Sequence, residues 1–146
     1  MLSARLAGLW RRWFGRPGAA PEGVGSRGER AAELFLCREK HFTVRDRNWK
    51  HRRDELDLVC QDGAILVFVE VKTRAAHAKV AGYHAVDRRK KKALLRACRA
   101  YIAQMVVRPR TFRFDIVELE HVDGEITAIR HFENVPLFSK AYRRGG

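Results

Sequence analysis

The sequence lacks a long apolar run, paired cysteines and clustered histidines. None of its 146 residues lies in an apolar stretch of the roughly 20 positions needed to cross a bilayer, so we expect no stable membrane insertion. The three cysteines lie far apart without a C-x-x-C pair, which argues against a zinc knuckle and a disulfide framework and fits a reduced cytoplasmic compartment. The six histidines form no H-x-H or H-x-x-x-H pair, so each is expected to be an ordinary surface or core residue.

Acidic residues are scarce relative to basic ones. The chain has 17 Asp and Glu against 30 Lys and Arg, a formal net charge of +13. Such an excess favours a polyanionic partner, and it favours nucleic acid over a membrane surface. The length fits one domain that is large enough to bury a core.

The most informative stretch contains two apolar runs, Leu56–Cys60 and Ala64–Val71. They are separated by a short polar segment that contains Asp62-Gly63, and an Asp-Gly pair between two such runs predicts a β-hairpin. A two-residue turn at Asp62-Gly63 would pair Gln61 with Ala64.

This register decides which charged side chains share a face. It would place Asp57 opposite Phe68 and Glu55 opposite Glu70. Because paired and alternate residues of a hairpin share a face, four charged side chains would project from one side: Glu55, Asp57, Glu70 and Lys72. A slip by one residue would move Asp57 to the opposite face.

Three crowded carboxylates repel one another unless positive charge lies among them. Lys72 can neutralise one of the three charges, and a hard divalent cation with oxygen ligands is expected to neutralise the rest. The alternative is a salt-bridged polar face on an antiparallel sheet, since strands with one solvated face are common.

The remaining pattern divides the chain into three parts. Residues 1–27 are expected to form a flexible, basic and aromatic N-terminal extension, residues 28–132 the folded domain, and residues 133–146 a tail. Within the domain we predict a helix from Gly28, with Ser26 as its cap and Glu29 in its first turn. The further predicted elements are a strand from Phe42 to Trp49, a loop over Ala75–Ala85, a helix over Asp87–Met105 capped by Asp87, a strand over Thr111–Glu118 and a hairpin turn at Asp123-Gly124 that leads into a strand over Glu125–Phe132. This order predicts an α/β fold with a mixed sheet.

Two basic segments flank the hairpin. The segment Arg45–Arg53 carries five basic side chains and Trp49, which could hold a phosphate backbone and stack on a base; alternatively, Trp49 covers the edge of the core. Five consecutive cations, Arg88 to Lys92, begin the second helix, where the macrodipole prefers negative charge. An anionic partner would explain them, and so would a merely solvated charged face.

Several motifs together resemble the YraN family of bacterial proteins. They are R-x-R-N-W at Arg45–Trp49, E-L-D-L-V at Glu55–Val59, F-V-E-V-K-T-R at Phe68–Arg74 and R-F-D-I-V at Arg113–Val117. The resemblance covers about Gly28 to Glu118. It implies the restriction-endonuclease-like superfamily, with an αβββαβ core and an extra C-terminal edge strand.

The resemblance also implies roles for individual residues. The superfamily signature falls on Asp57, Glu70 and Lys72, with Glu29 as an auxiliary carboxylate. Asp57, Glu70 and the carbonyl of Val71 would hold Mg²⁺ or Mn²⁺, and Lys72 would orient the attacking water or stabilise the transition state. The expected nucleic-acid contacts are Arg45, Arg47, Trp49, Arg74, Arg88, Arg89, Lys90 and Lys91.

The implied function is metal-dependent hydrolysis of phosphodiesters in DNA. Branched and single-stranded DNA are the substrates considered. The alternative is a non-catalytic nucleic-acid-binding protein that retains the nuclease fold. One departure from the family is Asp54, which replaces the usual glycine and would add a charge beside the site. Whether the chain forms a homodimer stays open.

Overall fold

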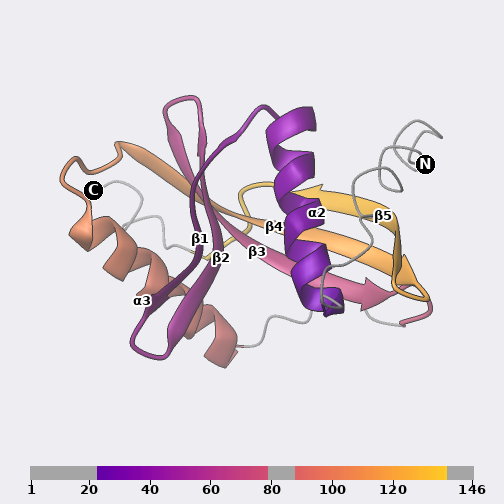
Figure 1. Cartoon of the computed structure of the whole chain (residues 1–146). Coiled ribbons are helices and arrows are strands. Elements are labelled where there is room, and N and C mark those ends of the chain that lie inside the picture. The colour runs from indigo at the N-terminus through magenta and orange to yellow at the C-terminus, as the bar shows by residue number, and fades with distance from the viewer. Residues whose placement is uncertain (1–22, 79–87, 138–146) are drawn as a thin grey trace.

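The computed structural model describes residues 23–78 and 88–137 (Figure 1). The elements in order are α2 (Val24–Glu39), β1 (Thr43–His51), β2 (Asp54–Asp62), β3 (Ile65–Ala75), α3 (Arg88–Gln104), β4 (Thr111–Val122) and β5 (Glu125–Phe132). This is the predicted αβββαβ core followed by one extra strand. The predicted cap Asp87, most of the N-terminal extension, part of the loop after β3 and most of the tail lie outside the described residues.

The strands form one five-stranded sheet in the order β1-β2-β3-β4-β5. Only β3 and β4 run parallel, and every other neighbouring pair is antiparallel. A parallel pair needs a crossover connection, and α3 lies in the connection between β3 and β4. The sheet is therefore mixed, as predicted.

The two helices pack on opposite faces of the sheet. The apolar stripe of α3 is buried in one core cluster with side chains from β2, β3 and β4, whereas α2 buries its small and aliphatic face in the other. In β3, Leu66 and Phe68 belong to the α3 cluster, and Val67 and Val69 belong to the α2 cluster, as the alternation of a strand requires.

The α3 face of the sheet has an apolar part and a charged part. Helix α3 packs mainly against β1 and β2, and the apolar residues of β4 in its cluster end at Ile116. Beyond Ile116, the alternate positions of β4 are occupied by Glu118 and Glu120. The far ends of β3 and β4 thus present charged side chains where α3 no longer supplies apolar partners.

The first hairpin turns one residue later than predicted. Asp62 pairs with Ile65 and Gln61 with Leu66, so the turn is Gly63-Ala64 and the predicted pairing of Gln61 with Ala64 is wrong. Arg113 of β4 binds the Asp62 carboxylate at 3.0 Å, which holds Asp62 in the strand. Gly63 then takes the first turn position with φ +55°, where a glycine is readily accommodated.

The prediction for the second hairpin is confirmed, whereas the prediction for the N-terminal cap of α2 is wrong. Val122 pairs with Glu125, and Asp123 and Gly124 both have positive φ, which confirms the predicted two-residue turn. Helix α2 begins at Val24, so Ser26 lies inside its first turn and the predicted cap is wrong. Gly23 occupies the cap position, and no side chain makes a capping hydrogen bond there.

Gly28 allows α2 to approach the sheet closely. A Cβ atom at Gly28 would lie 2.0 Å from Oγ1 and 3.2 Å from Cβ of Thr73 on β3. Only a residue without a side chain fits this contact. The contact also fixes Glu29, the next residue, beside the end of β3.

A fully buried carboxylate joins β4 to β5 and to the segment after it. Asp115 accepts hydrogen bonds from Arg113 Nε at 3.0 Å and from the main-chain amide of Asn134 at 2.9 Å, and its Oδ2 lies 2.8 Å from His131 Nε2. Burial by itself raises the pKa of Asp115, but the hydrogen bonds from His131, Arg113 and Asn134 outweigh it and hold that pKa below its ordinary value.

Candidate active site

Asp57 lies where β2 and β3 separate. The last recorded pair of the two strands is Leu58 with Val69. One residue further on, the Asp57 carboxylate crosses to β3 and accepts the main-chain amide of Val71 at 2.7 Å. Leu58 belongs to the apolar cluster that packs against α2, and Leu56 belongs to the cluster that packs against α3. The side chains of β2 therefore change faces of the sheet at Asp57, and Asp57 belongs to neither cluster.

Glu70 is buried next to this contact and is paired with two lysines. Its side chain is 5% exposed, and its Oε1 lies 3.3 Å from the ammonium of Lys72 and 3.3 Å from that of Lys90. Lys72 follows two places later on β3, and Lys90 comes from the first turns of α3. The structure therefore brings Asp57, Glu70 and Lys72 together, in a shifted register, and adds Lys90.

The shift of register did not separate these residues because it moves the pairing by two positions. Gln61 pairs with Leu66 rather than with Ala64, and an even shift leaves each residue on the same face. Phe68 pairs with Val59, so the predicted opposition of Asp57 to Phe68 is wrong, and the same shift removes the predicted opposition of Glu55 to Glu70.

Asp57 carries the strongest electrostatic perturbation of the cluster. Burial and then the negative charge of Glu70 raise its pKa from 3.8 to about 7, with a smaller contribution from Glu29. The amide of Val71 and the charge of Lys90 oppose the rise in this pKa. When two carboxylates are partly buried next to each other, ionisation of both is unfavourable, because each negative charge raises the pKa of the other. A cation bound between them would offset this repulsion.

The donor set fits a hard divalent cation that keeps part of its shell for water or substrate. Within residues 23–78 and 88–137, no group of three or more His, Cys, Asp or Glu side chains is arranged to hold a metal ion. Mg²⁺ in phosphoryl-transfer sites commonly uses only one or two carboxylates together with phosphate oxygens. Asp57, Glu70 and the carbonyl of Val71 are oxygen donors of that kind.

The other carboxylates near the signature have different surroundings. Glu29 on α2 is half-buried and acts on Asp57 through its charge. Glu55 is exposed and pairs with Lys50 on β1 at 3.7 Å, so the predicted third member of the carboxylate group faces another partner. Asp54 binds Arg96 of α3 through both oxygens, at 2.8 and 3.0 Å, and this hydrogen bonding lowers its pKa. Asp54 is thus tied to α3.

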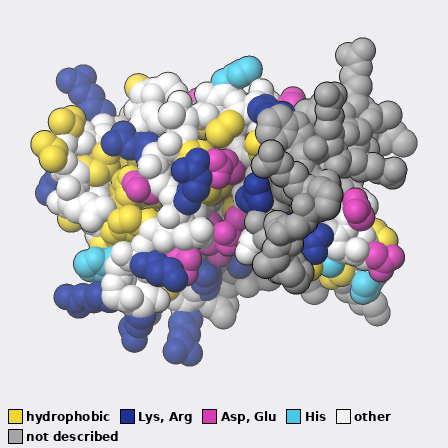
Figure 2. Space-filling view, viewed as in Figure 1, with side chains coloured by type: hydrophobic (Ala, Val, Ile, Leu, Met, Phe, Trp, Pro, Cys, Tyr) yellow, Lys and Arg dark blue, Asp and Glu magenta, His cyan; other side chains and the backbone are white. Residues whose placement is uncertain are grey.

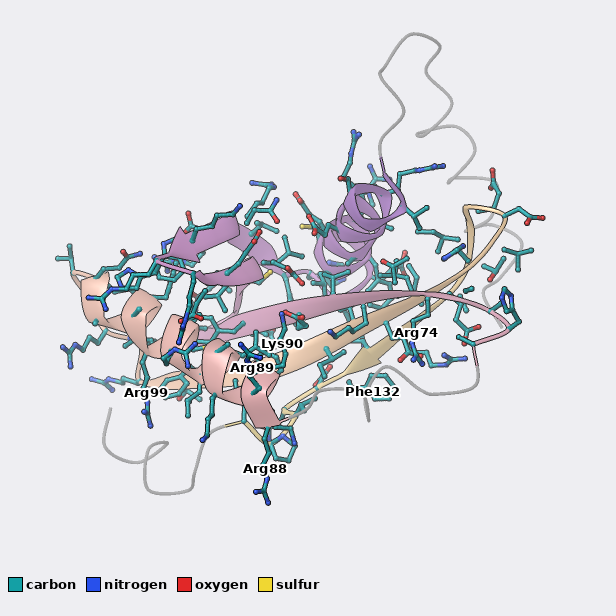
Figure 3. The ribbon with its side chains drawn as sticks, turned by 90° about the horizontal axis from the view of Figure 1, so that it is seen from below. Arg74, Arg88, Arg89, Lys90, Arg99 and Phe132 are labelled. Carbon is teal, nitrogen blue, oxygen red and sulfur yellow. The ribbon has the colours of Figure 1, made fainter. Side chains whose placement is uncertain are left out.

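Of the predicted nucleic-acid contacts at the start of α3, Lys90 reaches the cluster through Glu70. Arg88, Arg89 and Lys91 are exposed, and Figure 3 shows Arg88, Arg89 and Lys90 on the first turn of the helix. Lys and Arg side chains gather along the side of the molecule where α3 and the tip of the β1–β2 hairpin lie (Figure 2). No acidic residue stands in the first turn of α3 to offset these cations.

The β1 side chains that were predicted to contact nucleic acid make contacts with other side chains of the protein. Arg47 donates from Nε to Glu33 of α2 at 2.8 Å, and Arg45 donates to Gln61 at 3.2 Å. Trp49 packs against the α3 cluster, with its ring 5.3 Å from that of Tyr101 in an edge-on arrangement. Trp49 therefore covers the edge of the core, the alternative that the sequence left open.

Two features near the cluster were missed at the level of sequence. Lys90 was expected only to contact nucleic acid, and nothing local signalled that it would reach Glu70. The continuation of β4 past Glu118 was also missed, although the alternation of Ile116, Glu118 and Glu120 was a usable signal for a charged strand face.

Comparisons with known proteins agree with the motifs. The model of the uncharacterised protein family UPF0102 matches residues 28–119. A UPF0102 protein of Nitratidesulfovibrio vulgaris strain DP4 is 42% identical over 98 residues, which cover 67% of this chain and 72% of that protein. A UPF0102 protein of Chlorobium phaeobacteroides strain BS1 is 35% identical over 113 residues, covering 77% of this chain and 89% of that protein.

A relative from a third organism extends this agreement. A UPF0102 protein of Anaeromyxobacter dehalogenans strain 2CP-C is 35% identical over 118 residues, covering 81% of this chain and 87% of that protein. The matched region contains the helix, the three-strand unit, α3 and most of β4, which together carry every residue of the cluster. The chain therefore belongs to the UPF0102 family, also called YraN, and has the mixed α/β core that its motifs implied.

Proposed function

We propose that this protein is a metal-dependent nuclease that hydrolyses phosphodiester bonds in DNA. The observation that carries the proposal is the meeting of Asp57, Glu70 and Lys72 where β2 and β3 part. Two oxygen-bearing acids and a lysine beside a run of exposed cations are the groups that phosphodiester hydrolysis needs.

Each residue has a part in that reaction. A bound divalent cation supplies neutralisation of the phosphate charge and a lower pKa for the attacking water. Asp57, Glu70 and the carbonyl of Val71 would hold the cation. Lys72 would orient the water or stabilise charge in the transition state, and the exposed cations at the start of α3 would hold the DNA backbone.

One observation favours a second function, a DNA-binding protein without turnover. Two ammonium groups, those of Lys72 and Lys90, already lie on the same oxygen of Glu70. A glutamate with two cationic partners is stable without a metal ion. In this alternative the basic segments bind DNA and the signature residues serve only the fold.

A cleavage panel separates the two functions. Purified protein is incubated with flap, junction, single-stranded and duplex DNA in Mg²⁺, in Mn²⁺ and in EDTA. The proposal expects metal-dependent cleavage that falls by roughly 10²–10³ in Lys72→Ala, while DNA binding is retained. Lys50→Ala is the matched control, because Lys50 pairs with Glu55 outside the cluster. Cleavage that persists in Lys72→Ala, or tight DNA binding with no cleavage of any substrate, would contradict the proposal.

A further inference from the structure

A hollow lies further along β3, on the same face as Glu70. Its volume is about 370 Å³, and it is lined by Arg74, Glu118, Glu120, Arg130, Phe132 and two alanines, Ala75 and Ala78. We call it the β3–β5 pocket. The sheet register explains the grouping, because Arg74 pairs with Glu120, Glu118 with Arg130 and Ile116 with Phe132.

The charges in the β3–β5 pocket balance. Arg130 Nη1 lies 2.8 Å from Glu118 and 2.6 Å from Glu120, so this guanidinium is occupied by two carboxylates. With Arg74 added, the lining contains two positive and two negative side chains. A phosphate gains little net attraction in such a place, whereas a neutral group with both donors and acceptors can hydrogen-bond to either kind of side chain.

Phe132 gives the pocket an aromatic wall. The side chain is half-buried, packed on its inner side against the α3 cluster. Aromatic rings serve as stacking platforms for unpaired bases, with little dependence on sequence. The volume of 370 Å³ also lies within the roughly 300–1,000 Å³ usual for pockets that enclose a small organic group.

The pocket lies at a suitable distance from the candidate active site. Arg74 is four residues after Glu70 on β3, which corresponds to about 13 Å along a strand. Nucleotides of one strand rise about 3.4 Å each, so a few nucleotides span this distance. Arg74 and Phe132 lie close together in Figure 3, and Lys90 lies apart from them on the first turn of α3.

We propose that the β3–β5 pocket receives one unpaired base of a DNA strand whose phosphates lie on the cations of α3. This inference rests on the proposed function and specifies its substrate class as DNA with a single-stranded segment. A base inside a duplex could enter only after it is unstacked and unpaired, which costs several kcal/mol. Phe132 stacks on the base, and the Arg74, Glu120 and Arg130 side chains meet its polar edge.

The test measures binding of DNA with a short single-stranded overhang, in EDTA so that no cleavage takes place. One base at a time is removed from the overhang, leaving an abasic sugar. We expect one position at which this removal weakens binding by roughly 5- to 150-fold, the range of one base–aromatic stack. In Phe132→Leu, which keeps an apolar group against the core, the loss at that position should shrink to less than about twofold.

Two further variants make the result specific. Phe35→Leu makes the same change of ring to aliphatic side chain on the α2 face, and it should keep the abasic penalty. Ala78→Trp fills the rim of the pocket from an exposed position and should abolish the penalty as Phe132→Leu does, even where the latter is poorly folded.

Two results would overturn the inference: equal penalties at all overhang positions, or a penalty that survives in both Phe132→Leu and Ala78→Trp. The failure of this inference can be distinguished from the failure of the nuclease proposal. An abasic penalty without metal-dependent cleavage would contradict the nuclease alone, and cleavage without the penalty would contradict the pocket alone.

Discussion

The carboxylate of Asp57 accepts the amide of Val71 at 2.7 Å, across the gap where β2 and β3 separate. This hydrogen bond takes the place of a ladder bond and draws an acidic side chain to the residue that directly follows Glu70. The crowding of two carboxylates is therefore built into the backbone of the sheet. Both the electrostatics of the cluster and its proposed chemistry follow from this one contact.

Asp57 should make stability fall as pH rises. Burial and the charge of Glu70 raise the pKa of Asp57 to about 7 in the folded protein from an ordinary 3.8. Between these values the folded state holds a proton that the unfolded chain has lost, so the free energy of unfolding decreases with pH, by up to about 1.4 kcal/mol per pH unit. Asp57→Asn keeps an acceptor for Val71 but does not titrate. Urea unfolding at pH 4.5 and pH 8 measures the free energy of unfolding of both proteins. The variant should be more stable relative to the wild type at pH 8 than at pH 4.5. An equal difference in the free energy of unfolding at both pH values would contradict this.

The two lysines on Glu70 should differ in catalysis and agree in metal binding. Both ammonium groups lie 3.3 Å from the same carboxylate oxygen and compete with a cation for it. Lys72→Ala and Lys90→Ala should each tighten Mn²⁺ binding by about two- to fivefold, since a partly exposed ion pair contributes up to about 1 kcal/mol. Only Lys72→Ala should lose cleavage. Calorimetric titration with Mn²⁺ measures the first effect, with Lys50→Ala as control, and weaker Mn²⁺ binding in either variant would count against a cation at this place.

Gly28→Ala should destabilise the protein through its contact with Thr73. The added Cβ would lie 2.0 Å from Thr73 Oγ1, and relieving the overlap should cost about 1–3 kcal/mol in the free energy of unfolding. Thr73→Ala removes Oγ1, the atom in the severe overlap, and leaves the Thr73 Cβ at 3.2 Å. The double variant should therefore be more stable than the sum of the single changes predicts, by more than about 0.5 kcal/mol. Urea unfolding of the four proteins gives this coupling. If the effects of the two substitutions on the free energy of unfolding are strictly additive, α2 moves away from the sheet without loss of stability, and the prediction is contradicted.

Asp115→Asn should weaken the fold strongly at neutral pH. The substitution leaves the part-buried Arg113 with only the more exposed Asp62 as a counter-charge, and breaking a buried pair costs up to about 3–5 kcal/mol. The pKa of Asp115 is held below its ordinary value, so its contribution is present above about pH 4 and is lost as pH falls through the folded-state pKa. The difference in the free energy of unfolding between wild type and variant should therefore shrink as the pH falls, which acid unfolding curves measure. Asp123→Asn, in the β4–β5 turn, should stay within about 0.5 kcal/mol of the wild type.

Sequence pattern alone determined the order and type of the elements and the face that Glu70 and Lys72 share on β3. The alternation of apolar residues, the Asp123-Gly124 turn and the apolar stripe of α3 are local signals, because each reflects the geometry of a single strand, turn or helix. For this reason the convergence of Glu70 and Lys72 survived an error in the turn of the first hairpin. Parity within a strand does not change when the pairing moves by two residues.

Tertiary packing alone decided what surrounds those residues. Lys90 meets Glu70, and Arg96 meets Asp54, because of where α3 crosses the sheet. The contact of Asp57 with Val71 forms where β2 and β3 separate. The β3–β5 pocket depends on the parallel register of β3 with β4, strands that are joined through a helix. Contacts between distant segments are selected by the packing of the whole core, and no short stretch of sequence encodes them.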